Sequence, residues 1–455
     1  MSAGAPPAAR LPLVVIPQHF GSLVFDRRTS RYAPFDREAT EVLARTLETP
    51  AWQLAGARPE LAGFLACFER AGYFRPDGRL AGVRLTADPP ADHLLGPLAV
   101  HVEVIAACNL TCTHCFAGEL PRRTTLTTPE LDRVFGELAA LGSFRLGLTG
   151  GEPLLRKDLL DVLDAATARG LHPCLTTNGL LLDERLAREL GRRELVWLNI
   201  SLEGARAETN DAVRGAGTFD AVLGKLRVLG RHMRFTLAFT ITSHNAAEVE
   251  ACAALAREVG AHTAVFRPLY PVGVARAHPE LAPTFAEYTG ALARLATAAC
   301  DPAGDPGGAV LRALGAGELS RGGGTIDAFG PALRVETQAI TYRGPGCGAA
   351  NLVASISASG DVNPCSFLGA AFESGNVRER PFAEIWNAGQ AFLRLRARAE
   401  GDAFRGGCRA RSLAAHGSAF APDPWHDEWL AAGDPEAPRP LTNLHVRRPH
   451  LPVLR

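Results

Sequence analysis

The sequence has 455 residues, which is enough for about three domains at roughly 150 residues each. Lys and Arg number 48 and so do Asp and Glu, so the charge balance favours neither nucleic acid nor an anionic membrane as a partner. The ten cysteines are too sparse for a secreted disulfide framework, and we find neither a signal-peptide pattern nor an apolar run of about 18 residues. We therefore expect a cytoplasmic protein whose thiols stay reduced and are able to bind metal.

Residues 10–86 form a small unit of their own. Two short alternating runs, 21–27 and 31–35, flank a polar turn and predict a β-hairpin. Asp36 is placed to cap a helix, a second helix is expected at 59–71, and a last short strand at 80–85. This order predicts a winged-helix-like module, although the segment is not distinctly basic.

The same segment resembles the PqqD-like peptide-recognition domain. The resemblance rests on Gly21–Asp26, on Tyr32–Asp36 and on the helix that follows. It implies that the leader of a precursor peptide adds as an extra strand to the edge of the module's sheet. The alternative is a docking domain without a ligand of its own. Residues 87–92 are expected to link the module to the next domain.

From residue 98 to about 300, apolar runs alternate with amphipathic segments of helix length. This alternation is typical of parallel sheets built from βαβ units. It predicts an α/β fold, a partial and open (β/α)6 version of the TIM barrel, with its active site at the carboxyl ends of the strands. The expected strands are 102–107, 144–149, 173–177, 196–202, 235–241 and 263–267, and the expected helices are 129–141, 157–168, 184–190, 219–229 and 247–259.

Three cysteines follow the first of these strands. Cys108, Cys112 and Cys115 have C-x3-C-x2-C spacing, and thiolates suit iron–sulfur clusters and zinc. A cubane cluster needs four ligands, so three thiolates leave one iron open to a substrate or cofactor. The alternatives are a zinc site that borrows His114 and reduced thiols that bind no metal.

Polar residues also follow later strands. Gly150–Pro153 places two glycines, which let backbone approach a ligand closely, beside the carboxylate of Glu152. Asn178 follows the third strand, and Ser201 and Glu203 end the fourth. Each motif alone is weak, because Asn-Gly and Glu-Gly also mark ordinary turns. Their order after the three cysteines is specific.

With these motifs the chain resembles a radical S-adenosylmethionine (SAM) enzyme. The resemblance implies that the three cysteines hold a [4Fe–4S] cluster whose open iron binds SAM, with flavodoxin or ferredoxin as electron donor. Reductive cleavage of SAM then yields a 5′-deoxyadenosyl radical that removes hydrogen from the substrate. The implied SAM contacts are His114, which replaces an aromatic residue and can stack on adenine, Gly150, Gly151, Glu152 and Pro153 at the methionine ammonium, Asn178 at the rim, Ser201 and Glu203 near the ribose, and Arg214 at the carboxylate.

A second set of cysteines lies in the last third of the chain. After a Gly- and Pro-rich linker at 301–343, residues 344–430 resemble the SPASM/twitch extension on Cys347, on Gly360 to Cys365 and on Gly407 to Arg409. Three of the usual seven cysteines imply one auxiliary cluster, with His416, water or substrate as fourth ligand. The alternative is a degenerate extension without a cluster. Residues 431–455 are expected to be irregular, and four thiols are interpreted as core: Cys67, Cys174, Cys252 and Cys300.

Three functions follow from these features. The first is a maturase that forms a carbon–sulfur or carbon–carbon crosslink in a ribosomally made peptide. The second is a tetrapyrrole-tailoring enzyme similar to those of haem biosynthesis, for which the segment 23–32 has no obvious use. The third is a zinc-holding scaffold without enzymatic activity.

Overall fold

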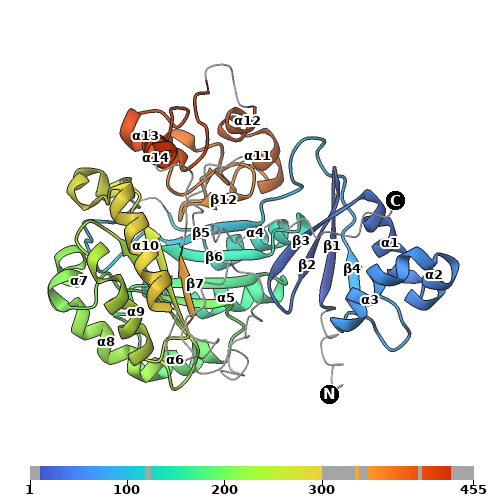
Figure 1. Ribbon diagram of the computed structural model, residues 1–455, viewed down its shortest axis with the longest axis horizontal. Helices are drawn as coiled ribbons and strands as arrows, with labels where there is room; N and C mark the ends of the chain where they lie inside the picture. Colours follow the sequence, from blue (N-terminus) through green and yellow to red (C-terminus); the bar gives the residue numbers. More distant parts are fainter. Residues whose placement is uncertain (1–10, 118–123, 300–333, 338–346, 398–401, 432–455) are drawn as a thin grey trace.

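The computed structural model describes residues 11–117, 124–299, 334–337, 347–397 and 402–431. In these ranges the strands form a four-stranded and a nine-stranded sheet. Figure 1 shows the large sheet at the centre, the N-terminal module on one flank and the C-terminal helices above it. Across the same ranges, none of the helices is both long enough and apolar enough to cross a bilayer.

The N-terminal module has the strand order β3-β2-β1-β4. The first three strands are antiparallel, and β4 returns parallel to β1. Its elements are β1 (Leu13–Gln18), β2 (Gly21–Asp26), β3 (Arg31–Asp36), α1 (Arg37–Glu48), α2 (Ala51–Ala57), α3 (Ala62–Arg70) and β4 (Gly82–Arg84). The hairpin and both expected helices are present, whereas α2 lacks a strong periodic pattern and was not predicted.

The cap predicted for the first helix is present. The Asp36 carboxylate accepts a hydrogen bond from the backbone N–H of Ala39 at 2.8 Å, which satisfies a donor that the helix itself cannot pair. The core interpretation of Cys67 is wrong, because this thiol is exposed on α3. Cys252 is buried as expected, Cys174 is half-buried, and Cys300 lies outside the described residues.

The sheet of the module is buried on both faces. Val14, Ile16 and Phe25 belong to the core of the central domain, whereas Leu13 and Val15 pack against the module's own helices. Strand side chains alternate between the two faces, so this pattern requires a partner on each side. The module is therefore packed onto the barrel rather than tethered beside it.

Polar contacts reinforce this docking. The Tyr32 hydroxyl donates to the carbonyl of Gly142 at 2.8 Å and accepts from the backbone N–H of Phe144 at 2.7 Å. The Phe25 ring stacks on Phe144 with centroids 4.8 Å apart, and the Arg27 guanidinium donates to the carbonyl of Gly170. Burial raises the pKa of Tyr32, so this hydroxyl stays protonated.

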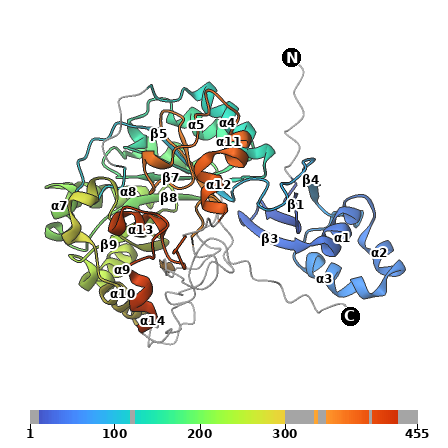
Figure 2. The same cartoon turned by 90° about the horizontal axis from the view of Figure 1, so that it is seen from above.

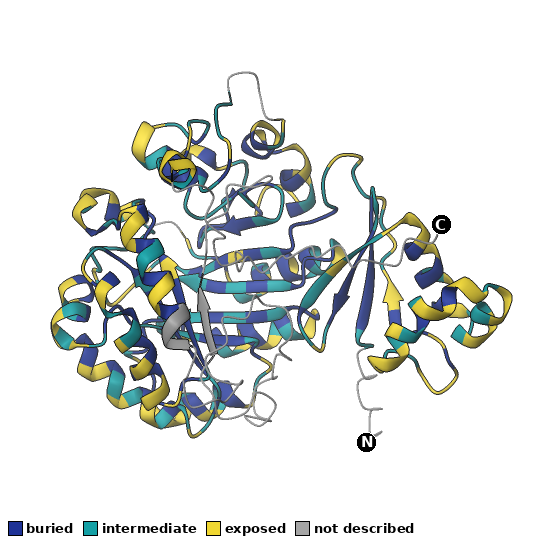
Figure 3. Ribbon diagram, in the orientation of Figure 1, coloured by how far each residue is buried: buried dark blue, intermediate teal, exposed yellow. Residues whose placement is uncertain are grey.

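The central domain is the predicted open barrel. Its six parallel strands lie side by side in the order β10-β9-β8-β7-β6-β5, and helices cover their outer face (Figure 3). The strands are β5 (Ala99–Ile105), β6 (Arg145–Gly150), β7 (His172–Thr177), β8 (Trp197–Ser201), β9 (Thr236–Ile241) and β10 (Thr263–Pro268). The helices are α4 (Thr128–Ala140), α5 (Leu159–Ala168), α6 (Glu184–Gly191), α7 (Ala207–Arg214), α8 (Thr218–Leu229), α9 (Val249–Glu258) and α10 (Phe285–Ala299).

Two details of the barrel differ from the prediction. The first strand begins at Ala99, three residues before the expected start, and ends at Ile105, so Ala106 and Ala107 belong to the loop. The sheet also continues on both sides, because β11 (Arg334–Thr337) pairs with β10 and β12 (Val353–Ile356) pairs with β5. β11 falls inside 301–343, which the sequence predicted to be a linker; the rest of that segment lies outside the described residues.

The C-terminal extension packs on the barrel through β12. Its hairpin partner is β13 (Val362–Asn363), and Gly360 in the turn has a φ of 96°, a conformation that favours glycine. The helices are α11 (Phe382–Ala388), α12 (Gln390–Arg396), α13 (Arg409–His416) and α14 (Trp425–Ala431). Seen from above, α14 lies beside α10, where Trp425 stacks on Tyr288 with centroids 5.4 Å apart (Figure 2).

Candidate functional site

The cysteine loop leaves the carboxyl end of β5 and is held by the glycine pair that follows β6. The N–H of Gly151 donates to the carbonyl of Ile105, and the N–H of Glu152 donates to the carbonyl of Ala107, both at 2.8 Å. A Cβ on Gly150 or on Gly151 would lie 2.2 Å from one of these carbonyl oxygens. The backbone that these glycines approach is therefore that of the cysteine loop itself.

Glu152 joins the loops after β6 and β7. Its buried carboxylate accepts from the Thr177 hydroxyl at 2.6 Å and from the backbone N–H groups of Asn178 and Leu154 at 2.7 and 2.9 Å. Burial raises the pKa of this carboxyl, although the three hydrogen bonds oppose that shift. The Asn178 amide donates to Asn109 at 2.7 Å, so the network reaches the cysteine loop.

A second carboxylate, Glu203, accepts hydrogen bonds on the other side of the barrel opening. It accepts from His114 Nε2 at 3.1 Å, from the Arg214 guanidinium at 3.0 Å and from the N–H of Thr240 at 2.7 Å. Burial opposes ionisation, yet the neighbouring His114 and Arg214 lower the pKa of Glu203 below its usual value. The side chains of all three are nearly inaccessible, at 2% for Glu203, 10% for His114 and 7% for Arg214.

This network fixes the orientation of His114. An ionised carboxylate only accepts hydrogen bonds, so the Nε2 that faces Glu203 carries the proton. Among the described residues, the buried Nδ1 has no hydrogen-bond partner. Ser201 is half-buried at the end of β8, two residues before Glu203. The predicted contacts therefore gather at one end of the barrel, in two carboxylate networks that the sequence did not reveal.

The three thiols of the loop affect one another's ionisation. Burial raises the pKa of Cys112 to about 11, Arg214 opposes this shift, and the charges of Cys115 and Cys108 add to it. In the described part of the chain, however, no group of three His, Cys, Asp or Glu side chains is arranged to hold one metal ion. A cubane binds each thiolate to a different iron and spaces the sulfurs more widely than zinc does.

The second cysteine set comes from three separate segments. Cys347 precedes β12, Cys365 follows β13 and Cys408 caps α13. Burial raises the pKa of Cys365 and of Cys408, and the thiol of Cys347 adds to both shifts. The three predicted ligands are therefore close together in space. His416 is exposed at the far end of α13, roughly 12 Å along the helix from Cys408, which makes it a poor fourth ligand.

Two charged residues beside this set have no sequence signal. The Asp423 carboxylate accepts from the N–H of Cys408 at 2.6 Å and pairs with Arg411 at 3.4 Å. The Arg411 guanidinium also lies 3.5 Å from the ring centroid of Trp425. Arg411 opposes the rise in the pKa of Cys408, so it favours the thiolate that a cluster needs.

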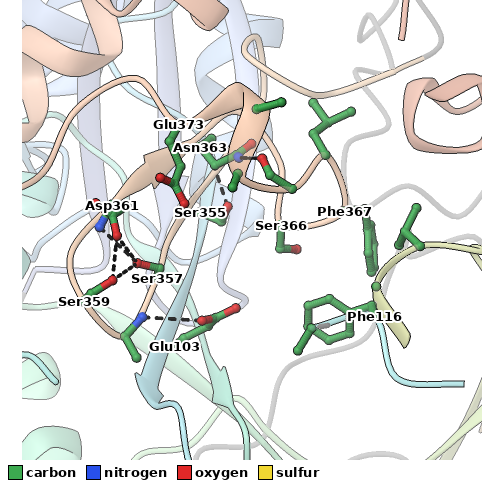
Figure 4. Close-up of a pocket in the computed structure, with 18 of the residues that line it drawn as sticks. Glu103, Phe116, Ser355, Ser357, Ser359, Asp361, Asn363, Ser366, Phe367 and Glu373 are labelled. Atoms are coloured by element: carbon green, nitrogen blue, oxygen red, sulfur yellow. Dashed lines mark hydrogen bonds between the residues drawn. The ribbon is translucent and has the colours of Figure 1, made fainter. Parts of the chain in front are cut away.

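A cavity of about 480 Å³ is lined by residues next to both cysteine sets in sequence, Phe116 after Cys115 and Ser366 after Cys365. Glu103 on β5, Asp361 and Glu373 line one side of it, and Phe116 and Phe367 stand on the other (Figure 4). Phe116 directly follows Cys115, and Phe367 comes two residues after Cys365; their rings meet edge to face with centroids 5.1 Å apart. Glu103 was not predicted as a site residue. Its only signal in the sequence is that Val100, Val102 and Val104 alternate along the other face of its strand.

Comparison with known proteins supports this picture. A model described as the radical SAM superfamily matches residues 102–256, and one described as an iron–sulfur cluster-binding domain, SPASM, matches 347–410. The AdoMet-dependent heme synthase of Methanosarcina barkeri is 30% identical over 350 residues, which cover 72% of this chain and 96% of that protein. The chain belongs to the radical SAM superfamily. This confirms the prediction of an enzyme with a SAM-binding [4Fe–4S] cluster and an iron–sulfur extension.

Two further similarities involve peptide-modifying enzymes. This radical SAM protein is 31% identical to the mycofactocin maturase MftC of Mycobacterium ulcerans over 347 residues, which cover 72% of the chain and 87% of the relative. The crystal structure of Streptococcus suis SuiB bound to its precursor peptide SuiA has the same fold, with a TM-score of 0.68 at 14% identity, over 90% of this chain and 97% of SuiB. Neither family model covers the N-terminal module, so its PqqD-like character stays a prediction.

Proposed function

We propose that this radical SAM enzyme is a maturase of a ribosomally made peptide and that it forms a carbon–sulfur or carbon–carbon crosslink. The observation that carries the proposal is the N-terminal module, which is packed onto the barrel while, among the strands that the structure describes, none pairs with the outer edge of β3. A peptide binds such an edge by adding a strand to the sheet. SuiB, whose fold matches this chain over nearly its full length, was solved with a precursor peptide bound.

We assign each cofactor to residues that the structure describes. Cys108, Cys112 and Cys115 hold the cluster that binds SAM. In the same loop, the buried Nδ1 of His114 has no hydrogen-bond partner among the described residues. Bound together, the cluster and SAM supply the radical that removes hydrogen from the substrate, with the electron coming from a flavodoxin or ferredoxin.

The chain's own networks hold the surroundings of these cofactors in place. Glu152 ties the loops after β6 and β7 to each other, and Glu203 fixes His114 and Arg214. We assign Gly150, Gly151, Pro153, Asn178 and Ser201 to the same binding surface, because they lie at the carboxyl ends of neighbouring strands. The second set, Cys347, Cys365 and Cys408, holds the auxiliary cluster.

The module also carries three aromatic side chains against which the leader's side chains would pack. Phe35 on β3 lies 6.2 Å from Phe64 and 6.0 Å from Phe68 on α3, measured between ring centroids, and all three side chains are half-buried. A strand added along β3 would lay alternate side chains against these rings. Main-chain hydrogen bonds would then supply affinity, and the aromatic rings would supply specificity.

Leader binding tests the proposal directly. A short open reading frame beside the gene supplies the candidate precursor, and its fluorescently labelled leader is titrated into the holoenzyme. We expect Phe68→Ser to weaken binding about tenfold or more, since it removes one of the rings against which the leader would pack. The matched control is Trp52→Ser, which removes an aromatic ring that is 59% exposed on α2 of the same module. Equal affinities for the wild type and Phe68→Ser contradict leader capture.

Product analysis tests the chemistry. A crosslink removes two hydrogen atoms from the core peptide, so co-expression of precursor and enzyme should lower the peptide mass by that amount. Tandem fragmentation then locates the new bond, because residues inside the linked loop no longer fragment separately. A product of unchanged mass with an inverted residue would make the enzyme an epimerase instead.

A second substrate class has one specific observation in its favour. The heme synthase of Methanosarcina barkeri is as similar to this chain as the maturase is, and 96% of it is matched. Titration with coproporphyrin III, followed by its visible absorption, tests this alternative. We expect no saturable binding, because the carboxylates of the cavity would repel propionate groups. The zinc-scaffold interpretation is wrong, since the chain belongs to an enzyme superfamily.

A further inference from the structure

A buried arginine beside the second cysteine set has an unused hydrogen-bond donor. Only 5% of the Arg411 side chain is exposed, and its Nη1 pairs with the Asp423 carboxylate at 3.4 Å. The Nη2 of the same guanidinium is also buried, and it has no hydrogen-bond partner among the described residues. Leaving a buried charged donor unpaired is costly, so an acceptor that the protein side chains do not supply is expected at this position.

The guanidinium is held close to Cys408. The Asp423 carboxylate accepts from the backbone N–H of Cys408 at 2.6 Å and from that of Trp425 at 3.0 Å, so one carboxylate binds both the cysteine and Arg411. The Arg411 Cζ lies 3.5 Å from the centroid of the Trp425 ring, which covers one face of the guanidinium. These two contacts fix Arg411 beside the backbone of Cys408.

Aromatic contacts connect Arg411 to a second cysteine segment. Its Cζ lies 5.7 Å from the ring centroid of Tyr270, and that ring lies 4.8 Å from the ring of Phe367. Phe367 comes two residues after Cys365. The guanidinium is therefore on the side of α13 that faces the second cysteine set, and not on the side that faces solvent.

The neighbouring arginine of the same helix differs in this respect. Both terminal nitrogens of Arg409 have acceptors, because Nη2 pairs with Asp402 and Nη1 donates to the carbonyl of Ala419, each at 2.9 Å. The unused donor is thus a property of Arg411 and not of every buried arginine in α13.

The two members of the Arg411–Asp423 pair act on the same sulfur with opposite signs. Burial and the thiol of Cys347 raise the pKa of Cys408, Arg411 opposes this rise, and Asp423 adds to it. Arg411 therefore favours negative charge on the sulfur, whereas Asp423 disfavours it.

We propose that Arg411 donates a hydrogen bond from Nη2 to a sulfur of the auxiliary cluster and raises the reduction potential of that cluster. The inference rests on the cluster assigned to Cys347, Cys365 and Cys408 and is independent of the substrate. One-electron reduction adds one negative charge to a cluster, and a cation fixed in a buried site stabilises that charge. Hydrogen bonds to the sulfurs and net charge are among the factors that set such potentials.

A redox titration of the reconstituted holoenzyme tests the inference. Dithionite supplies the electrons, and EPR follows the reduced clusters. The signal that SAM alters belongs to the first cluster, and the signal that disappears in Cys365→Ser belongs to the auxiliary cluster. We expect Arg411→Met to make reduction of the auxiliary cluster about tenfold less favourable, which lowers its midpoint by about 59 mV. Arg411→Lys keeps the charge but loses the planar fork and should lower the midpoint less.

Two further variants separate charge from packing. Asp423→Asn removes the negative charge, keeps an oxygen that accepts from the N–H of Cys408, and should raise the midpoint. A packing defect gives no reason for opposite shifts from the two members of one ion pair. The control Arg405→Met removes an exposed cation three residues before Cys408 and should leave the midpoint unchanged, because solvent screens that charge.

The outcomes distinguish this inference from the assignments around it. A midpoint that Arg411→Met leaves unchanged, or that Arg405→Met lowers equally, overturns the role of Arg411 and leaves the auxiliary cluster standing. If no EPR signal depends on Cys365, the cluster assignment and this inference both fall. Loss of leader binding or of the crosslink contradicts the maturase function without moving the midpoint.

Iron content and thermal unfolding verify that each variant keeps its fold and its clusters. If Arg411→Met loses iron, Arg411→Lys and Asp423→Asn decide the question by the sign of their shifts. A lowered midpoint in the first and a raised midpoint in the second support the inference, and shifts of the same sign overturn it.

Discussion

The two cysteine sets are built in opposite ways. Cys108, Cys112 and Cys115 share one loop, and Cys108 is exposed, whereas Cys347, Cys365 and Cys408 come from three segments and are all half-buried. The first set is open on the side where a diffusible cofactor must enter. The second is enclosed by the β12–β13 hairpin, α13 and Asp423.

This difference predicts that the first set serves the reaction and that the second also stabilises the structure. The loop of the first set is held by backbone hydrogen bonds from Gly151 and Glu152, which do not involve the cysteine side chains. The second set has no such loop of its own, so a cluster there would cross-link segments that are far apart in sequence. We therefore expect loss of the first cluster to cost activity and loss of the second to cost stability as well.

The largest effect is expected from Cys112→Ala. It removes one thiolate from the first set, so 5′-deoxyadenosine formation should fall to the detection limit in reconstituted protein. The fold should persist, because the loop keeps its bonds to Gly151 and Glu152. Chromatography of the SAM cleavage products and thermal unfolding measure the two properties. Continued formation of 5′-deoxyadenosine would remove the assignment of this loop.

Cys365→Ser tests the other half of the comparison. Iron should drop from roughly eight to about four atoms per chain, because one cubane is lost. SAM cleavage without substrate should continue, and the unfolding temperature should fall, since the variant loses a cluster and buries a hydroxyl.

Two thiols outside both sets provide controls for that experiment. Cys252→Ser places a hydroxyl in the buried core of α9 and should lower the unfolding temperature without changing the iron content. Cys67→Ser alters an exposed thiol on α3 and should change neither. An iron content that Cys365→Ser leaves unchanged would favour the degenerate extension without a cluster.

Glu203→Gln should have an intermediate effect. It leaves His114 and Arg214 buried without their shared charge partner, and hydrogen bonds to charged groups contribute about 1.5–3 kcal/mol. We expect SAM affinity to fall about tenfold or more, as measured by isothermal titration on cluster-loaded protein. Glu208→Gln, an exposed carboxylate on α7 nearby, serves as the control. Equal affinities in both variants would limit Glu203 to a structural role.

The smallest effect concerns an ion pair between barrel and extension. Arg378 donates to Glu130 on α4 at 2.6 Å and lowers the pKa of that carboxyl from 4.5 to about 2. A depressed pKa stabilises the fold fully above about pH 4.5, so the contribution is constant around neutrality and is lost as the pH falls toward 2. A double-mutant cycle of Glu130→Gln and Arg378→Met should give a coupling of about 1 kcal/mol. A coupling indistinguishable from zero would mean that other contacts hold the extension.

The sequence predicted most of the fold because local signals agree with the tertiary structure. The helix at 128–140 starts with a capping box of Thr127 and Glu130, and the barrel strands are apolar runs with clear bounds. The prediction failed where burial depends on distant segments. α3 carries Cys67 on its exposed side, and β11 is recognisable as a strand only through its pairing with β10.

The site shows the same limit. The C-x3-C-x2-C spacing predicted the first cysteine set, and the resemblance to the SPASM/twitch extension predicted the second, but neither predicted the carboxylate networks that support the first. His114 and Glu203 are 89 residues apart and meet only because β5 and β8 end at the same edge. In the sequence, Glu103 only interrupts an apolar run. In the structure, it lines a cavity together with residues of the β12–β13 hairpin.

The burial of the N-terminal sheet on both faces affects which residue of a bound peptide can react. Because the sheet of the module packs directly against the barrel, that packing sets the distance from the β3 edge to the cavity. If the leader binds at that edge as proposed, the residue that reaches the radical is set by its number of residues from the anchor. Inserting or deleting residues between leader and core should move the modification along the peptide.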